Sequence, residues 1–369
     1  MRPEATRGFP PGFARGRVNR DALLALSRVP GIVPRDLHAL AWREGSASAC
    51  LRAVRGKALG EANAREADAA RLEDLREALV ACEARMLVPG EPGYPKALED
   101  LPDPPAWLFV RGRLPDARTV AVVGARKCSP YGREVAETLG GGLASAGVCV
   151  VSGAAIGVDA AGHRGALGAG GPTVAILGSG IDVLHPPSNR RLIGEVAACG
   201  AVLSEYPPGT PPEPRRFPAR NRIVAALSEA AVVVEGAFGS GSLITAELAL
   251  ELGRPVLAVP GPITSPLSEA PLGLISDGAG LVQGADDVLE ALGLLGGEGA
   301  TRSVPNLPET EQRALESVAG TPMTAESVAL TSGLPPGEVL AALASLELRG
   351  LVRSVGGRYE RTAGAGRGG

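Results

Sequence analysis

The sequence predicts a doubly wound α/β core, in which helices cover both faces of a parallel sheet, with a small N-terminal helical domain and a C-terminal winged-helix domain. Three observations predict the core: six short apolar runs recur through the middle of the chain, helix-sized alanine-rich segments separate them, and glycine follows nearly every run. Near-continuous apolar strands that alternate with helices are typical of a parallel sheet buried on both faces. The six runs are Val120–Val123, Val148–Val151, Val174–Leu177, Ala201–Leu203, Val232–Val234 and Val256–Val259.

The N-terminal part of the chain predicts a helical domain. Residues 1–17 carry arginines but lack the apolar stretch of a secretory signal, so we expect a disordered basic arm. Residues 18–90 predict short helices around the turn Val29–Pro34, in a domain of the SAM or helix-hairpin-helix kind. One amphipathic helix is expected over residues 61–88, where Pro89 and Gly90 stop it.

The C-terminal part predicts a separate small domain. The α/β core is expected over residues 91–294, and a glycine-rich flexible linker over 295–306. Residues 307–361 predict three helices (309–318, 324–331 and 336–349) and a hairpin that turns at Gly356-Gly357, which is the pattern of a winged helix. Its third helix carries few basic residues, so we expect a protein contact or a vestigial role rather than duplex binding. Residues 362–369 are expected to be a disordered tail.

The composition narrows the classes of function. No apolar run approaches the ~20 residues that span a membrane. Five widely spaced cysteines without a C-x-x-C pair predict reduced thiols in the cytoplasm, and three scattered histidines make a metal centre improbable. We therefore expect no cofactor and no metal. The net charge of −3 excludes general attraction to DNA, so any nucleic-acid site must be a local basic patch.

A proline-rich loop over residues 204–222 supplies such a patch. Proline fixes φ and removes backbone donors, so this stretch is neither a helix nor a central strand until about Asn221, where a helix is expected to begin. Guanidinium groups and flat rings on a stiff backbone suit a phosphorylated, base-bearing chain. The alternative is a surface loop whose arginines are merely solvated. The residues concerned are Arg215, Arg216, Arg220 and Arg222, with Tyr206 and Phe217.

The turns after the strands predict an anion-binding edge. Ligands of open α/β sheets bind beyond the carboxyl ends of the strands, where glycine lets backbone N–H groups approach an anion. The first such loop adds Arg126 and Lys127. There is no G-x-x-x-x-G-K-[ST] and no G-x-G-x-x-G, which argues against a P-loop ATPase and a nicotinamide dehydrogenase. Each glycine taken singly also fits an ordinary tight turn.

Two further features point to the same edge. The segment 236–247 opens a helix with glycines and serines, and Ser240 or Ser242 is the expected N-cap, which makes a natural phosphate seat. The aromatic residues of the core, Tyr131, Tyr206, Phe217 and Phe238, all fall outside the strand runs. This placement suits base stacking, with loop packing as the alternative.

Seven motifs in order across residues 118–285 resemble the DprA/Smf family of DNA-processing proteins. They are Gly124-Ala-Arg126, Ser152-Gly-Ala-Ala-Ile-Gly-Val-Asp159, Leu177-Gly-Ser-Gly-Ile-Asp182, Ser204-Glu-Tyr206, Phe217-Pro-Ala-Arg-Asn-Arg222, Ser240-Gly-Ser-Leu-Ile-Thr245 and Val259-Pro-Gly261. The resemblance implies a Rossmann-like core that binds single-stranded DNA, forms a homodimer and helps to load RecA recombinase onto incoming strands during natural transformation, without catalytic turnover.

The resemblance and the loop chemistry together predict a DNA-binding set. Two departures from the family pattern touch it: Pro187 stands where some members have lysine, and Leu272 where the family has asparagine. The predicted set is Gly124, Arg126, Lys127, Gly153, Gly178, Gly180, Asn189, Arg215, Arg216, Phe217, Arg220, Asn221, Arg222, Ser240, Gly241, Ser242 and Thr245.

The alternative function is an enzyme. Segment 236–247 loosely resembles the P-G-G-x-G-T-x-x-E loop of nucleoside-monophosphate phosphoribohydrolases, in which Glu247 would act on the N-glycosidic bond. The loop lacks the P-G-G start and has extra residues before the glutamate. Asp159 and His163 lie at helical spacing, and we expect them to pin a helix rather than to catalyse.

Overall fold

The computed structural model describes residues 8–32, 34–294, 307–318, 322–349 and 351–361. The chain divides into two compact units, Met1–Gln283 and Gly284–Gly369. The predicted linker over 295–306, the tail over 362–369 and the first seven residues of the predicted arm lie outside the described residues. Within the described ranges, no helix is both long and apolar enough to cross a membrane.

The first unit is built on a nine-stranded sheet with the order β1-β2-β6-β5-β4-β3-β7-β8-β9. All neighbouring strands from β6 to β9 are parallel, which confirms the predicted α/β class. The strand order reverses between β3 and β7, so their carboxyl ends flank a topological switch point, where ligands of such sheets bind. These strands are β3 Thr119–Val123, β4 Cys149–Ser152, β5 Thr173–Leu177, β6 Ala201–Ser204, β7 Ala230–Val233, β8 Val256–Ala258 and β9 Gly280–Leu281.

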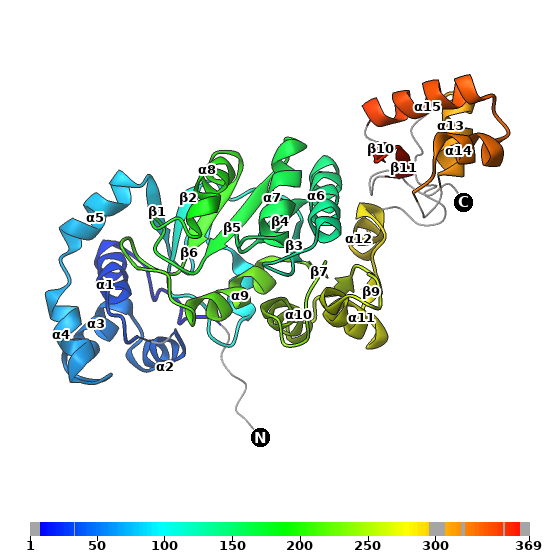
Figure 1. Ribbon diagram of the computed structural model, residues 1–369. Helices are drawn as coiled ribbons and strands as arrows, with labels where there is room; N and C mark the ends of the chain where they lie inside the picture. The colour runs from blue at the N-terminus through cyan, green and yellow to red at the C-terminus, as the bar shows by residue number, and fades with distance from the viewer. Residues whose placement is uncertain (1–7, 33, 295–306, 319–321, 350, 362–369) are drawn as a thin grey trace. The chain divides into compact units, whose positions relative to one another are not determined.

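Helices cover both faces of this sheet (Figure 1). Alternate residues of a strand point to opposite faces, so Ala121 and Val123 of β3 enter one core cluster with residues of α9 and α10, whereas Val122 faces Gly162 of α7. The helices α6, α7 and α8 lie on the second face. Their bounds are α6 Pro130–Ser145, α7 Val158–Gly168, α8 Arg190–Cys199, α9 Arg216–Leu227, α10 Gly241–Glu251 and α11 Glu269–Ser276.

Two antiparallel strands extend the sheet beyond β6. Strand β1 (Ala84–Leu87) pairs with β2 (Leu108–Gly112), which in turn pairs with β6. The prediction of one helix over residues 61–88 is therefore wrong. The chain forms α4 (Glu61–Ala69) and α5 (Leu72–Ala81), separated by extended backbone at Ala70 and Arg71. The segment Ala-Arg-Met-Leu of β1 favours helix by propensity, and its pairing with β2 overrides that preference.

The N-terminal helices pack against the same unit. They are α1 (Arg17–Ser27), α2 (Pro34–Glu44) and α3 (Ala47–Arg55). The prediction of disorder is wrong for residues 8–16, because Phe13 is 2% exposed within the core of these helices and Phe9 stacks on it with 4.7 Å between ring centroids. This burial fixes the start of α1.

The second unit contains the predicted winged helix. Three helices pack around a core that includes Leu315, Val328 and Leu343, and a hairpin turns at Gly356 and Gly357, both of which have positive φ. Strand β11 also bridges to Met323 through Tyr359. The elements of this unit are α12 Ala285–Ala291, α13 Glu309–Ser317, α14 Ala325–Ser332, α15 Pro336–Leu348, β10 Val352–Val355 and β11 Arg358–Arg361.

Candidate functional site

A cleft of about 320 Å³ lies at the carboxyl ends of β3, β4 and β7, beside the switch point of the sheet. Its walls come from the loop after β3, the loop after β4, the start of α9 and the start of α10. Most of the predicted DNA-binding set meets there. These residues are Gly124, Arg126, Lys127, Gly153, Phe217, Arg220, Asn221, Ser240, Gly241, Ser242 and Thr245.

Two cations lie exposed at the cleft. Neither Arg126 nor Lys127 forms an ion pair with any residue that the structure describes, and both side chains reach solvent. The Arg126 guanidinium lies over the ring of Phe217, 5.1 Å from its centroid. Gly178 allows this ring to sit close, since a Cβ there would lie 2.8 Å from Phe217 Cδ1. The cleft therefore has a cation and a flat ring already in contact.

A third cation is buried in the wall of the cleft. Arg220 is 4% exposed and donates from Nη1 to the carbonyl of Ile176, while its Nε has no hydrogen-bond partner among the described residues. Burial lowers the pKa of Arg220 to about 10, although the carboxylate of Asp159 opposes this shift. A Cβ on Gly153 would lie 2.3 Å from both Arg220 Nη1 and Nη2, so only glycine leaves room for the guanidinium. Arg220 is thus a buried positive charge with incomplete hydrogen bonding.

At two places around the cleft, an acidic side chain of the protein accepts from the backbone N–H groups that could otherwise bind an anion. Glu235 accepts hydrogen bonds from the N–H of Ser129 at 2.8 Å and from its hydroxyl at 2.5 Å, at the N-cap of α6. Asp159 accepts from the N–H groups of Gly153 at 3.1 Å and Ala155 at 3.3 Å, and its burial raises the pKa of its carboxyl group. These two carboxylates hold the loops in place and leave no vacancy for an external anion.

The N-terminus of α10 is different. Its N-cap Ser240 makes no side-chain capping bond, and the hydroxyls of Ser240 and Ser242 lie 2.8 Å apart at the cleft. Asn221 of α9 donates to the carbonyl of Gly241 at 3.1 Å, which ties the two helix starts together. An uncapped helix N-terminus with nearby hydroxyls favours a phosphate. Among the described residues that line the cleft, Ser240 and Ser242 at this end of α10 therefore form a candidate phosphate site.

The structure does not bring Arg222 to the cleft. Its Nε lies 3.0 Å from Asp103 Oδ2 and its Nη2 lies 2.7 Å from Glu205 Oε1, with the side chain 8% exposed. Burial alone would lower the pKa of Arg222, but the two carboxylates together raise it. The prediction that Arg220 and Arg222 line one pocket is wrong for a geometric reason. Residues two apart on a helix point in nearly opposite directions.

Five other members of the predicted set lie outside the cleft lining. Arg215 and Arg216 both pair with Glu213, at 2.7 and 3.0 Å, and Arg216 also covers the ring of Tyr206 at 5.1 Å. Asn189 is buried and donates to the carbonyls of Ala154 and Ala155, so it supports the loop after β4 from behind. Gly178 and Gly180 permit close backbone packing.

Sequence reasoning missed the supporting carboxylates Glu235, Asp103 and Glu205. Of these, Glu235 had a usable signal, because an acid that ends the buried run of β7 must find donors inside the protein. The contact of Asp103 with Arg222 joins residues 119 positions apart and has no local signal.

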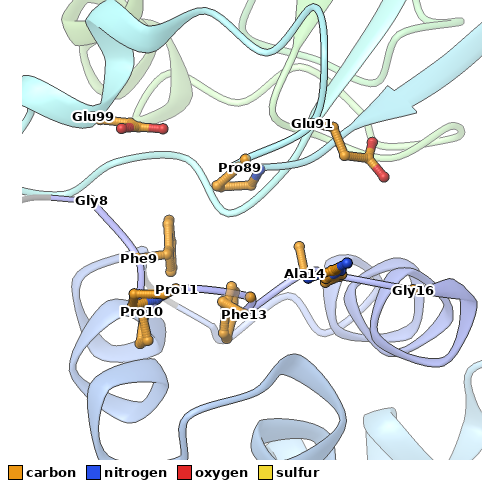
Figure 2. A pocket seen from close by; sticks show the side chains of 13 residues that line it. Gly8, Phe9, Pro10, Pro11, Phe13, Ala14, Gly16, Pro89, Glu91 and Glu99 are labelled. Carbon is orange, nitrogen blue, oxygen red and sulfur yellow. The ribbon is translucent and has the colours of Figure 1, made fainter.

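A larger cavity of about 460 Å³ lies elsewhere in the same unit. Residues 8–16 form one side, and residues 89–91 with Glu99 form the other (Figure 2). Its lining is mainly glycine, proline and phenylalanine, with the acids Glu91 and Glu99 and one cation, Arg15. This lining does not favour a polyanion. Among the described residues, no group of three acidic, histidine or cysteine side chains is placed to hold a metal.

Comparison with known proteins shows which family the chain belongs to. The family model of DNA recombination-mediator protein A matches residues 85–293, which include every wall of the cleft. The chain belongs to the DprA family. The model of the DprA winged helix domain matches residues 298–358.

Relatives within the family span most of the chain. A putative DNA processing protein DprA of Mycobacterium tuberculosis is 43% identical over 269 residues, which cover 70% of this chain and 69% of that protein. The protein Smf of Escherichia coli is 39% identical over 284 residues, which cover 73% and 75% of the two chains.

Two solved DprA structures are also similar. The X-ray structure of DprA from Streptococcus pneumoniae matches with a TM-score of 0.66 and 34% identity, over 73% of this chain and 97% of that one. DprA from Helicobacter pylori, whose structure addresses its single-stranded DNA binding mode, matches with a TM-score of 0.52 and 31% identity, over 57% and 95%.

Proposed function

We propose that this protein binds single-stranded DNA without strong sequence preference and loads RecA recombinase onto it during natural transformation and recombination. The observation that carries the proposal is the meeting of an under-bonded buried cation, Arg220, with the open N-terminus of α10 in one cleft. Both favour an anion, and the mouth of the cleft adds Arg126 and Lys127. A chain of phosphates satisfies all of these groups.

The binding mechanism follows from which donors are free. A backbone phosphate accepts from the N–H groups and hydroxyls at Ser240 and Ser242, while Arg220 supplies charge from the cleft wall. When a phosphate binds at the cleft, Arg126 turns from the Phe217 ring to pair with it. When a base stacks on Phe217, Arg126 stays over the ring. Phosphate contacts carry no sequence information, so binding of this kind is indifferent to base identity.

The preference for unpaired DNA rests on the aromatic rings. Arginines already cover one face of Phe217 and of Tyr206, at 5.1 Å in each case. An unpaired base can stack against a ring and a guanidinium together, whereas bases in a duplex are stacked on each other.

We further propose that the protein acts as a homodimer in the cytoplasm and performs no catalysis. The phosphoribohydrolase alternative requires a carboxylate at the cleft from α10, but Glu247 is exposed and lies outside the cleft lining. The carboxylate of Asp159 is held by two backbone N–H groups. His163 is fully buried and bonded to Thr173. None of these groups is placed to attack a glycosidic bond.

The test compares affinities for single-stranded and double-stranded oligonucleotides of the same length by fluorescence anisotropy. We expect tighter binding of the single strand, with similar affinity for unrelated sequences. RecA loading is tested separately, by following RecA filament growth on DNA coated with single-strand-binding protein, with and without this protein. Equal affinity for duplex and single strand would contradict the binding proposal, and unchanged filament growth would contradict the loading proposal.

A further inference from the structure

An apolar surface borders the cleft, with one carboxylate beside it, that of Glu269, which accepts from the N–H of Phe238 at 3.4 Å. Its residues come from the start of α6, which follows β3, and from the loops after β7 and β8, and these three strands are neighbours in the sheet. Phe238 is 87% exposed, Ile263 is 89% exposed and Tyr131 is 44% exposed. We call these three residues the apolar shelf.

The loops of the shelf are tied to one another. The hydroxyl of Tyr131 donates to the carbonyl of Pro260 at 2.9 Å, which links the start of α6 to the loop after β8. The loop after β7 is fixed at Gly236, whose N–H donates to Leu267 at 2.7 Å and whose carbonyl accepts from Ala270 at 2.9 Å. Phe238 is therefore held out into solvent by a pinned turn.

The apolar shelf lies next to the N-terminus of α10. Phe238 precedes the N-cap Ser240 by two residues, which limits their Cα separation to about 7 Å. Ala237, Ser240 and Leu267 of the same loops line the cleft itself. A strand whose phosphate rests at the start of α10 brings its attached base to this surface within one nucleotide.

The distribution of charge indicates whether the bases or the phosphates of a bound DNA strand contact the shelf. Residues 236–242 and 259–268 contain no lysine and no arginine, so beyond the N–H groups and hydroxyls at the start of α10 they offer no positive charge to a phosphate. The cations of the cleft are Arg126 and Lys127, in the loop after β3, and Arg220 of α9. An apolar surface next to a cationic one matches the two sides of a single strand, whose bases are flat and apolar and whose backbone is charged.

We propose that the apolar shelf is a stacking platform for unpaired bases next to the phosphate seat, with Phe238 as its main contact. This inference rests on the proposed binding of single-stranded DNA and adds the path of the strand, which leaves the cleft across the loops after β7 and β8. Stacking accepts every base, so the shelf contributes affinity without sequence preference.

The test measures the affinity for a dye-labelled oligothymidylate in the full-length protein. Phe238→Ala should weaken binding about tenfold, the loss typical of one base stack. The dependence of affinity on salt should stay unchanged, because stacking releases no counterions. Leu250→Ala, at the far end of α10 and also exposed, is the matched control and should bind as the wild type does.

A second variant reports the contact directly. Phe238→Trp should keep the affinity, and its fluorescence should be quenched as oligothymidylate is added. A parallel titration of the wild type accounts for Trp42 and Trp107, the two tryptophans of the chain. An affinity of Phe238→Ala within twofold of the wild type, or a Phe238→Trp fluorescence that DNA does not quench, would overturn the inference. The affinity of Arg126→Ala tests the cleft separately.

The other possible occupants give distinct results. If Phe238→Ala changes the oligomeric state in solution but leaves DNA affinity intact, the shelf is an interface between copies and the inference is wrong. If the wild type binds no single-stranded DNA at all, the proposed function fails together with the shelf.

Discussion

Replacing Arg222 by alanine should destabilise the protein and leave its binding surface in place. The guanidinium bonds Asp103 at 3.0 Å and Glu205 at 2.7 Å, and its side chain is 8% exposed. Removing one partner of a buried ion pair costs about 3–5 kcal/mol, because the remaining charge stays buried without its partner. Asp103 is partly exposed, so we expect the lower end, about 3 kcal/mol. For a domain of this size that corresponds to a fall in Tm of about 6–12 °C.

The assay pairs thermal unfolding with DNA binding of the folded fraction. Arg222→Ala should unfold at the lower temperature and bind single-stranded DNA within about threefold of the wild type, since Arg222 lies outside the cleft. Asp103→Asn is a milder variant of the same contact and should lower Tm less, which keeps the reasoning testable if Arg222→Ala does not fold. A Tm equal to that of the wild type, with DNA affinity lost, would show that Arg222 contacts DNA and would refute the assignment.

Two further predictions concern the cleft and its surroundings. Gly153→Ala should weaken DNA binding about tenfold, as expected for a lost charge-assisted hydrogen bond, because the new Cβ would lie 2.3 Å from the Arg220 guanidinium. Gly168→Ala has no atom within 4 Å of its Cβ and serves as the control, so equal affinities in both variants would count against a role for Arg220. The pKa of His163 is lowered by burial, and then by Arg220 and Arg164, to about 3 from its usual 6.5. Folded protein therefore keeps His163 neutral while the unfolded chain takes up a proton, and stability should fall by about 1.4 kcal/mol per pH unit from 6.5 towards 3. His163→Asn should flatten that slope in urea titrations between pH 7 and pH 4, and identical slopes would contradict the role of burial.

The core sheet could be predicted from sequence because its signal is local. Each of the six apolar runs coincides with a parallel strand, since a strand buried on both faces must be apolar at successive positions. The strand β1 could not be found in this way. Its residues favour helix, and only the edge formed by β2, more than 20 residues later, makes them extended. Pairing between strands far apart in the chain produces no periodic pattern in the local sequence.

The location of the candidate cleft could be predicted from the sequence, and its detailed contacts could not. The glycines after the strands and the serines at the start of α10 predicted where the cleft lies, and Arg126, Lys127 and Arg220 line it. The sequence could not show that Glu235 fills the N-terminus of α6, or that Arg222 turns to Asp103, because both depend on which side chains meet across the fold. Helical geometry alone would have separated Arg220 from Arg222.

The salt dependence of single-stranded DNA affinity in Arg126→Ala tests the central claim most directly. If Arg126 neutralises a phosphate at the cleft, its removal should weaken binding by the same factor for unrelated sequences and reduce the slope of log affinity against log salt by about 0.7 to 1. Thermal stability should not change, since Arg126 is exposed and makes no ion pair with the described residues. A variant that binds as tightly as the wild type, with the same salt slope, would contradict the account.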